Sequence, residues 1–203
     1  MKIAIFGASG KIGSRVVELL SDKHEVIKIG SRSGDVIADF TDEESVKSVF
    51  KQIGNLDAVV SVVGGDSAFK PYQDLVDDDF RFGAERKLIA QFRIVRLAEK
   101  YLNDSGSVTL TSGFLSHYPN PHSIATGPFN AAIDAFVQHT APLLERGLRL
   151  NVVSPAPVVE PERVRTGLVS AEQVAQHYVT AIEGNESGNV LRAWGGLNNP
   201  LNQ

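Results

Sequence analysis

The sequence contains no cysteine among its 203 residues. This absence excludes a disulfide framework and any metal or redox centre that depends on a thiolate. Positive charge is not in excess either, because 20 lysines and arginines face 24 aspartates and glutamates, for a net charge of −4. Such a balance lacks the basic footprint of a nucleic-acid-binding domain. We therefore expect no nucleic-acid partner.

Long apolar runs are missing as well. No stretch reaches the roughly 18 apolar residues of a membrane-spanning helix, and the opening MKIAIFGASG enters a strand pattern without a charged leader. His24, His139 and His177 lack ligand-like spacing, and the acidic run 77–79 precedes a helix, where acidic side chains favour the helix dipole. These absences predict a cytoplasmic protein without a membrane or metal site, forming one domain over residues 1–203.

What the sequence does contain is an alternation of short β-branched runs and longer helical patterns. This alternation predicts an α/β fold, a parallel sheet with helices on both faces. The predicted strands are Lys2–Phe6, Glu25–Gly30, Val36–Ala38, Asp57–Ser61, Ser107–Thr111, Leu148–Val153 and Asn189–Arg192. The predicted helices are Lys11–Ser21, Glu43–Gln52, Asp79–Tyr101, Pro128–Glu145 and Ala171–Glu183.

A glycine loop, Gly7-Ala8-Ser9-Gly10-Lys11-Ile12-Gly13, joins the first predicted strand to the first predicted helix. This context is typical of a dinucleotide-binding site. Gly7 permits the tight turn, Gly10 lets the backbone approach a pyrophosphate, and Gly13 lets helix and strand pack closely. The helix N-terminus then offers unpaired N–H groups to the phosphates. We predict that the loop binds the cofactor through Gly7, Ser9, Gly10, Lys11, Ile12 and Gly13.

The end of the second predicted strand indicates which cofactor is bound. An NAD-preferring site places an acidic residue there to accept hydrogen bonds from the ribose 2′-hydroxyl. This chain instead has Ser31, Arg32 and Ser33. A guanidinium between two hydroxyls suits a 2′-phosphate in charge and in geometry. The sequence therefore predicts NADP(H) in preference to NAD(H).

Four further segments resemble the short-chain dehydrogenase/reductase family, and the resemblance runs over nearly the whole chain. They are Asp39-Phe40, Asp57–Gly64, the strand end Val108–Gly113, and Arg149-Leu150-Asn151-Val152-Val153-Ser154-Pro155. The resemblance implies a doubly wound Rossmann fold of about seven strands in the order 3-2-1-4-5-6-7. It implies that Ser112 binds the substrate carbonyl, and that the cofactor contacts Asp39, Phe40, Val63, Gly64, Asn130, Pro155 and Thr166.

The family's catalytic tyrosine and the lysine four residues after it are replaced in this chain. Aligned on Asn130–Phe136, the two positions are Thr126 and Asn130. Pro128 also predicts that the helix begins near this point, since proline favours the first helical turn. On the preceding helix Lys87 falls where the family has an asparagine, so an ammonium group would still lie near the nicotinamide ribose. The alternative is that Lys87 is a solvated helix residue.

Few residues remain as a replacement proton donor. Tyr118 lies six residues after Ser112, and His117 and His122 belong to the same loop; histidine is a reasonable acid near neutral pH. Each of them could also be an ordinary loop residue, and Ser112 could be a strand-end serine without a role. We list Ser112, Lys87 and Tyr118 as candidate catalytic residues.

Two functions from different classes are compatible with these residues. The first is an NADP(H)-dependent oxidoreductase that transfers hydride to a small carbonyl substrate. The second is a catalytically inactive sensor or scaffold that binds NADP(H), which the missing tyrosine and lysine favour. The family resemblance implies a homo-oligomer, a dimer or tetramer. The short stretch between Pro155 and Ala171 predicts an open substrate pocket, or one that a partner subunit covers.

Overall fold

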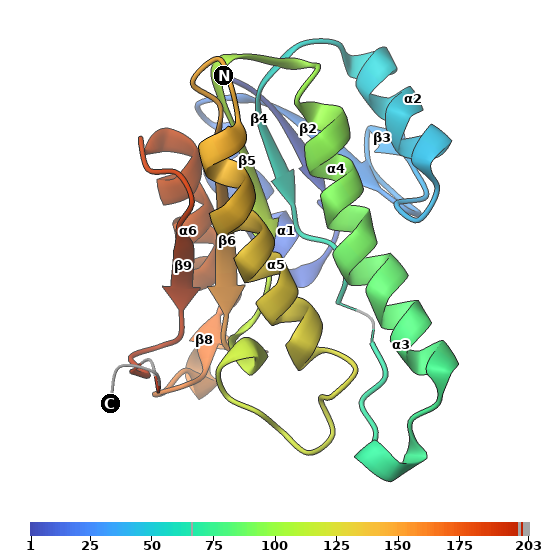
Figure 1. Cartoon of the computed structure of the whole chain (residues 1–203). Coiled ribbons are helices and arrows are strands. Elements are labelled where there is room, and N and C mark those ends of the chain that lie inside the picture. Colours follow the sequence, from blue (N-terminus) through green and yellow to red (C-terminus); the bar gives the residue numbers. More distant parts are fainter. Residues whose placement is uncertain (66, 199, 201–203) are drawn as a thin grey trace.

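The computed structural model describes residues 1–65, 67–198 and 200 of the chain (Figure 1). Its main sheet has seven parallel strands in the order β3-β2-β1-β4-β5-β6-β9, which confirms the predicted order. The strands are β1 Lys2–Phe6, β2 Glu25–Gly30, β3 Val36–Ile37, β4 Leu56–Ser61, β5 Leu102–Thr111, β6 Arg149–Pro155 and β9 Val190–Ala193. A separate pair, β7 Val158–Val159 and β8 Val169–Ser170, was not predicted.

Helices cover both faces of the sheet, because side chains of successive strand residues point to opposite faces. One core lies between the sheet and α2 (Glu43–Ile53), α4 (Ala90–Ala98) and α5 (Gly127–Thr140). The other lies between the sheet and α1 (Lys11–Ser21) and α6 (Ala171–Glu183). In β1, Ala4 and Phe6 belong to the first core, whereas Ile3 and Ile5 belong to the second. The result is the three-layer Rossmann arrangement, with loops at the carboxyl ends of the strands.

The predicted single helix Asp79–Tyr101 is divided in the structure. It consists of α3 (Asp77–Gly83), a π-helical turn at Ala84–Ile89, and α4. The acidic residues at positions 77–79 occupy the first turn of α3, where they favour the helix dipole. Turns of the π type are rare and often occur at functional sites. This one contains Arg86 and Lys87.

The start of α5 agrees with the prediction made from Pro128. Thr126 is the N-cap residue, and Pro128 lies in the first turn, where its missing N–H costs no helical hydrogen bond. The helix ends at Thr140, and a 3₁₀ turn at Ala141–Leu143 occupies much of the predicted remainder.

The described part of the chain contains no helix with the length and apolar character needed to cross a membrane. Within the same residues, no group of three or more histidine and acidic side chains is arranged to hold a metal ion.

Candidate functional site

The glycine loop lies between β1 and α1 and has two positions at which any side chain would collide with backbone. Gly7 has a φ of +81°, and a Cβ atom there would lie 2.3 Å from the Val62 oxygen. A Cβ at Gly13 would lie 2.1 Å from the Gly7 oxygen. Gly10 is the N-cap of α1 and provides no side-chain cap, so the first N–H groups of the helix are left for a ligand. The geometry leaves space for a pyrophosphate at this helix end.

A first cavity, of about 280 Å³, extends from the glycine loop to the ends of β2 and β3. We call it the adenosine cavity, after the part of a dinucleotide that this position would hold. Its walls include three residues that the sequence predicted here, Ser31, Asp39 and Phe40. The full lining is Gly7, Ser9, Gly10, Gly30, Ser31, Asp39, Phe40, Thr41, Val62, Val63, Gly64, Gly65 and Arg86.

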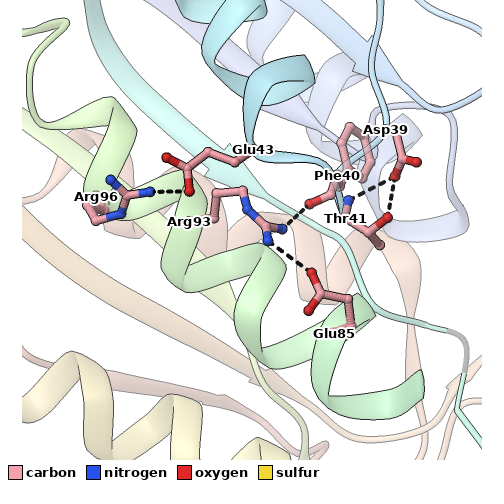
Figure 2. A network of polar contacts seen from close by, with 7 residues as sticks. All are labelled: Asp39, Phe40, Thr41, Glu43, Glu85, Arg93 and Arg96. Atoms are coloured by element: carbon pink, nitrogen blue, oxygen red, sulfur yellow. Dashed lines mark hydrogen bonds and ion pairs between the residues drawn. The ribbon is translucent and has the colours of Figure 1, made fainter. Parts of the chain in front are cut away.

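The wall around Asp39 and Phe40 is fixed by a network of polar contacts (Figure 2). Asp39 Oδ1 accepts hydrogen bonds from the Thr41 hydroxyl at 2.7 Å and the Thr41 N–H at 2.9 Å, and these bonds lower the pKa of the Asp39 carboxyl. On the other side, Arg93 donates to the Phe40 carbonyl at 2.8 Å and to Glu85 at 2.9 Å. Arg93 thus attaches the loop after β3 to α4 and positions the Phe40 backbone.

The cationic groups near this cavity differ from the expected ones. Arg32 and Ser33 are exposed and lie outside the residues that line either cavity. Arg86 of the π turn lines the adenosine cavity instead, with its guanidinium 4.7 Å from the centre of the Phe82 ring. Lys11 forms an ion pair with Glu160 at 2.9 Å. Sequence reasoning missed Arg86, because an arginine on a helix carries no motif and its place in the wall depends on tertiary structure.

A second cavity, of about 370 Å³, adjoins the first, and the two share the segment Val62–Gly65 together with Gly10. We call it the nicotinamide cavity. Five residues predicted to contact cofactor or substrate line this cavity and not the first one: Lys11, Ile12, Lys87, Ser112 and Pro155. Thr111 and Val158 complete the wall. The two adjoining cavities, which together we call the channel, lie along the carboxyl ends of the strands, where open α/β sheets bind their ligands.

Lys87 is buried in the wall of the nicotinamide cavity, with 5% of its surface exposed. Its ammonium group donates to the Ser112 carbonyl at 3.3 Å and to the Gly64 carbonyl at 3.5 Å. Burial lowers the pKa of Lys87 to about 8, although Asp134 acts in the opposite direction. Gly64 permits the close approach, because a Cβ there would lie 2.7 Å from the Lys87 Cα. The side chain is therefore not a solvated helix residue.

Ser112 follows β5, and its position is fixed from α4. Buried Gln91 accepts a hydrogen bond from the Thr111 N–H and donates one to the Thr111 carbonyl, each at 2.8 Å. The Thr111 hydroxyl lies 2.6 Å from the Tyr178 hydroxyl and donates to the Ser61 carbonyl at 2.5 Å. The Ser112 hydroxyl itself is buried and has no hydrogen-bond partner among the described residues. Ser112 thus lines the nicotinamide cavity, and its buried hydroxyl has unused hydrogen-bonding capacity.

Behind Ser112 lie two polar residues of α5, Asn130 and Asp134. Both are buried, at 3% and 6% exposure, and both carry oxygens without a hydrogen-bond partner in the described structure. A Cβ at Gly113 would lie 2.9 Å from Asn130 Nδ2, so the loop and α5 are in close contact. Sequence reasoning placed Asn130 at the cofactor but did not single out Asp134. No motif marks that aspartate, and its burial arises only when α5 packs against the loop after β5.

The remaining predicted residues lie away from the channel walls. The Tyr118 hydroxyl donates to the Asn198 carbonyl, and its ring meets Trp194 edge-on at 5.7 Å. The Thr126 hydroxyl lies 2.5 Å from that of Ser67. Thr166 is an exposed residue in the segment between β7 and β8. The roles assigned to all these residues stay predictions.

The chain is similar to known proteins in sequence and in fold. The family described as enoyl-(acyl carrier protein) reductase, of short-chain dehydrogenase type, matches residues 2–188. A hydroxynaphthalene reductase-like protein, Arp2, from Metarhizium brunneum is 32% identical over 76% of the chain. General stress protein 39 of Bacillus subtilis is 25% identical over 78% of it. The chain spans 57% and 60% of the lengths of these two relatives.

Solved structures match over a larger share of their length. The protein lin1944 from Listeria innocua superposes with a TM-score of 0.90 at 35% identity, covering 96% of this chain and 100% of that one. A small-chain dehydrogenase crystallised in complex with NADPH gives a TM-score of 0.87 at 24% identity, covering 97% of both chains. At 24% identity, the similarity to the small-chain dehydrogenase shows only a shared fold.

Proposed function

The chain belongs to the short-chain dehydrogenase/reductase family of NAD(P)-binding oxidoreductases, and from this premise we propose that it binds NADP(H) and reduces a small carbonyl compound. One observation carries the proposal. The glycine loop reaches both adjoining cavities through Gly10, whereas Ser31 lines only the adenosine cavity and Lys87 and Ser112 line only the nicotinamide cavity. A dinucleotide has its phosphates in the middle and its reactive ring at one end, so the channel suits it in shape and in polarity.

The residues present fit the cofactor on structural grounds. The absence of a side chain at Gly7 and Gly13 lets the loop pack directly against the Val62 backbone and lets α1 pack against the loop. The uncapped start of α1 offers N–H groups to an anion. The lining of the nicotinamide cavity includes Ser112, whose hydroxyl is unpartnered, and Lys87. When bound there, the nicotinamide supplies a hydride.

The choice of NADP(H) rests on the ribose end of the adenosine cavity. The strand end after β2 lacks an acid that would repel a 2′-phosphate, and Ser31 lines the cavity there. Arg86 adds a guanidinium to the same wall, and exposed Arg32 adds a second positive charge nearby in sequence. The small-chain dehydrogenase of the same fold that was crystallised with NADPH is compatible with this choice.

In the proposed reaction, two residues act on the reacting groups. The Ser112 hydroxyl donates a hydrogen bond to the carbonyl oxygen and stabilises the charge that develops on it. Lys87 holds a positive charge beside the ribose and the Ser112 backbone when protonated, and with a pKa of about 8 that charge is present at neutral pH and lost above it. Gln91 keeps Ser112 in place through its two bonds to Thr111.

The alternative is a protein that binds NADP(H) without turnover. It is supported by Thr126 and Asn130 at the positions of the family's tyrosine and lysine. The Thr126 hydroxyl contacts Ser67, and Asn130 is buried against Gly113. Neither group has the acidity of a tyrosine beside a lysine.

A two-part experiment tests the proposal. Thermal unfolding is followed with NADPH and with NADH, because a ligand that binds only the folded state raises the midpoint by mass action. NADPH oxidation is then followed with aldehydes, quinones and cyclic aromatic ketones, the last suggested by the name of the Metarhizium relative. Ser112→Ala removes the proposed donor, and Ser107→Ala, at a buried β5 serine that lines neither cavity, is the matched control.

We expect a larger stabilisation by NADPH than by NADH, and turnover that only Ser112→Ala abolishes. A larger shift with NADH would contradict the cofactor choice. NADPH binding without turnover of any substrate would favour the sensor.

We also propose that two copies of the chain associate through α4 and α5. Phe92 and Phe136 stack there at 3.9 Å in the wall of an open apolar groove that Ile89 and Leu144 extend. Light scattering on the wild type and on Phe92→Glu tests this association. We expect the wild type to be a dimer or tetramer and the charged variant to be dissociated.

A further inference from the structure

Asp134 is a buried carboxyl group for which the proposed reaction has so far no role. Neither of its carboxylate oxygens has a hydrogen-bond partner among the described residues. Burial raises the pKa of this carboxyl, and the Ser112 and Ser116 hydroxyls beside it offset the rise only in part. A buried charge without hydrogen bonds is costly, and taking up a proton removes the charge. The Ser112 hydroxyl, equally unpartnered, lies beside this group, and Ser112 lines the nicotinamide cavity.

A second hydroxyl, that of Ser116, lies beside Asp134 on the side of a half-exposed histidine. The Ser116 hydroxyl donates to the Gly113 carbonyl at 3.0 Å, so its oxygen is free to accept from His117 Nδ1 at 2.8 Å. His117 is half-exposed, with its ring 5.3 Å from that of Trp194. Histidine exchanges protons with solvent near neutral pH. The sequence of groups from solvent to substrate is thus His117, Ser116, Asp134 and Ser112.

We propose that Asp134 is the proton source of this site, donating through Ser112 and refilled through Ser116 and His117. The proposal rests on the carbonyl reduction described above. As the carbonyl carbon gains a hydride, the electron pair of its C–O π bond moves to oxygen, and that oxygen takes the Ser112 hydroxyl proton. Ser112 Oγ takes the carboxyl proton of Asp134. The carboxylate that remains is reprotonated by the His117 imidazolium through Ser116.

The charges around Asp134 suit a group that must both hold and release a proton. Lys87 faces it from the π turn, His117 from the loop after β5, and Arg192 from β9. Each of these cations favours the carboxylate, whereas burial favours the acid. The three positive groups therefore limit the cost of the negative charge left after donation.

The first test needs neither cofactor nor turnover. Infrared difference spectra of the protein at neutral pH would show the C=O stretching band of a protonated carboxylic acid. We expect this band to vanish in Asp134→Asn and to shift in Ser112→Ala, which removes the hydroxyl beside the carboxyl group. The control is Asp57→Asn, because hydrogen bonds from Asn103 and from the Lys2 N–H lower the pKa of that carboxyl. A spectrum that Asp134→Asn leaves unchanged, or a band indifferent to Ser112→Ala, would overturn the proposal.

The second test measures whether the acid is used. Asp134→Asn keeps the size of the side chain, and we expect kcat to fall about 100-fold with NADPH binding unchanged. His117→Asn should slow turnover and be rescued by imidazole in the buffer, whereas His139→Asn, exposed on the same helix as Asp134, should not change it. An unimpaired Asp134→Asn enzyme would remove Asp134 from the reaction. If the wild type reduces no carbonyl, the proposed function and this use of the acid fail together, and the infrared band still reports whether the acid–hydroxyl pair exists.

Discussion

Replacing Lys87 by methionine removes the one buried ammonium group of the nicotinamide cavity wall and makes a quantitative prediction about stability and pH. In the folded protein the pKa of Lys87 is about 8, against 10.5 for an ordinary lysine. Between these two pH values the unfolded chain holds a proton at Lys87 that the folded chain has released. Stability therefore rises with pH in this window. At about 1.4 kcal/mol per pKa unit, the contribution of Lys87 amounts to about 3 kcal/mol.

Lys87→Met should lack this rise. We expect the stability of the wild type relative to the variant to increase by about 3 kcal/mol between pH 7 and pH 10.5, because every other titrating group is common to both proteins. The lost bonds to the Gly64 and Ser112 carbonyls shift the two curves by a constant and leave the slope unaffected. Urea unfolding followed by circular dichroism over this pH range measures the difference. Parallel stability curves would refute the reasoning.

Three further substitutions test other parts of the site. Gly13→Ala places a Cβ 2.1 Å from a loop carbonyl, and we expect it to lower the free energy of unfolding in urea by about 1–3 kcal/mol and to weaken NADPH binding. Gly65→Ala has open space around its Cβ and should lower the free energy of unfolding by less. Arg93→Ala frees a backbone carbonyl in the adenosine cavity, so the Kd for NADPH from a fluorescence titration should rise while the thermal midpoint falls. Tyr178→Phe removes the buried hydroxyl that meets Thr111 and should lower stability by about 1 kcal/mol, and no loss in thermal unfolding would contradict that contact.

The features that the sequence predicted well are those that depend on neighbouring residues. The bounds of β1, β2, α1 and α6 agree with the predictions, since the apolar periodicity and the flanking residues are local. The glycine loop could be predicted from its glycines, the strand pattern before it and the helix pattern after it. The start of α5 followed from Pro128 alone.

The features that were missed depend on residues distant in sequence. Asp134 and Arg86 acquire their surroundings only when separate elements pack together, so nothing near them in the chain marks them. The residues of the π turn are mostly ones that favour ordinary α-helix, so their sequence does not mark the turn, and the close contact with Gly64 is a tertiary one. Strands β7 and β8 have two residues each, too few for a periodicity to be read.

The π turn determines which side chains line each cavity of the channel. It contains Arg86 and Lys87 as consecutive residues, one in the adenosine cavity and the next in the nicotinamide cavity. Successive residues of a helix project in different directions around its axis, so this one turn supplies a positively charged side chain to each of the two adjoining cavities. Deleting a single residue here would retain every functional group of the site and rotate α3 relative to α4. Such a deletion would test the relative orientation of α3 and α4 separately from the chemical groups of the site, which no side-chain substitution can do.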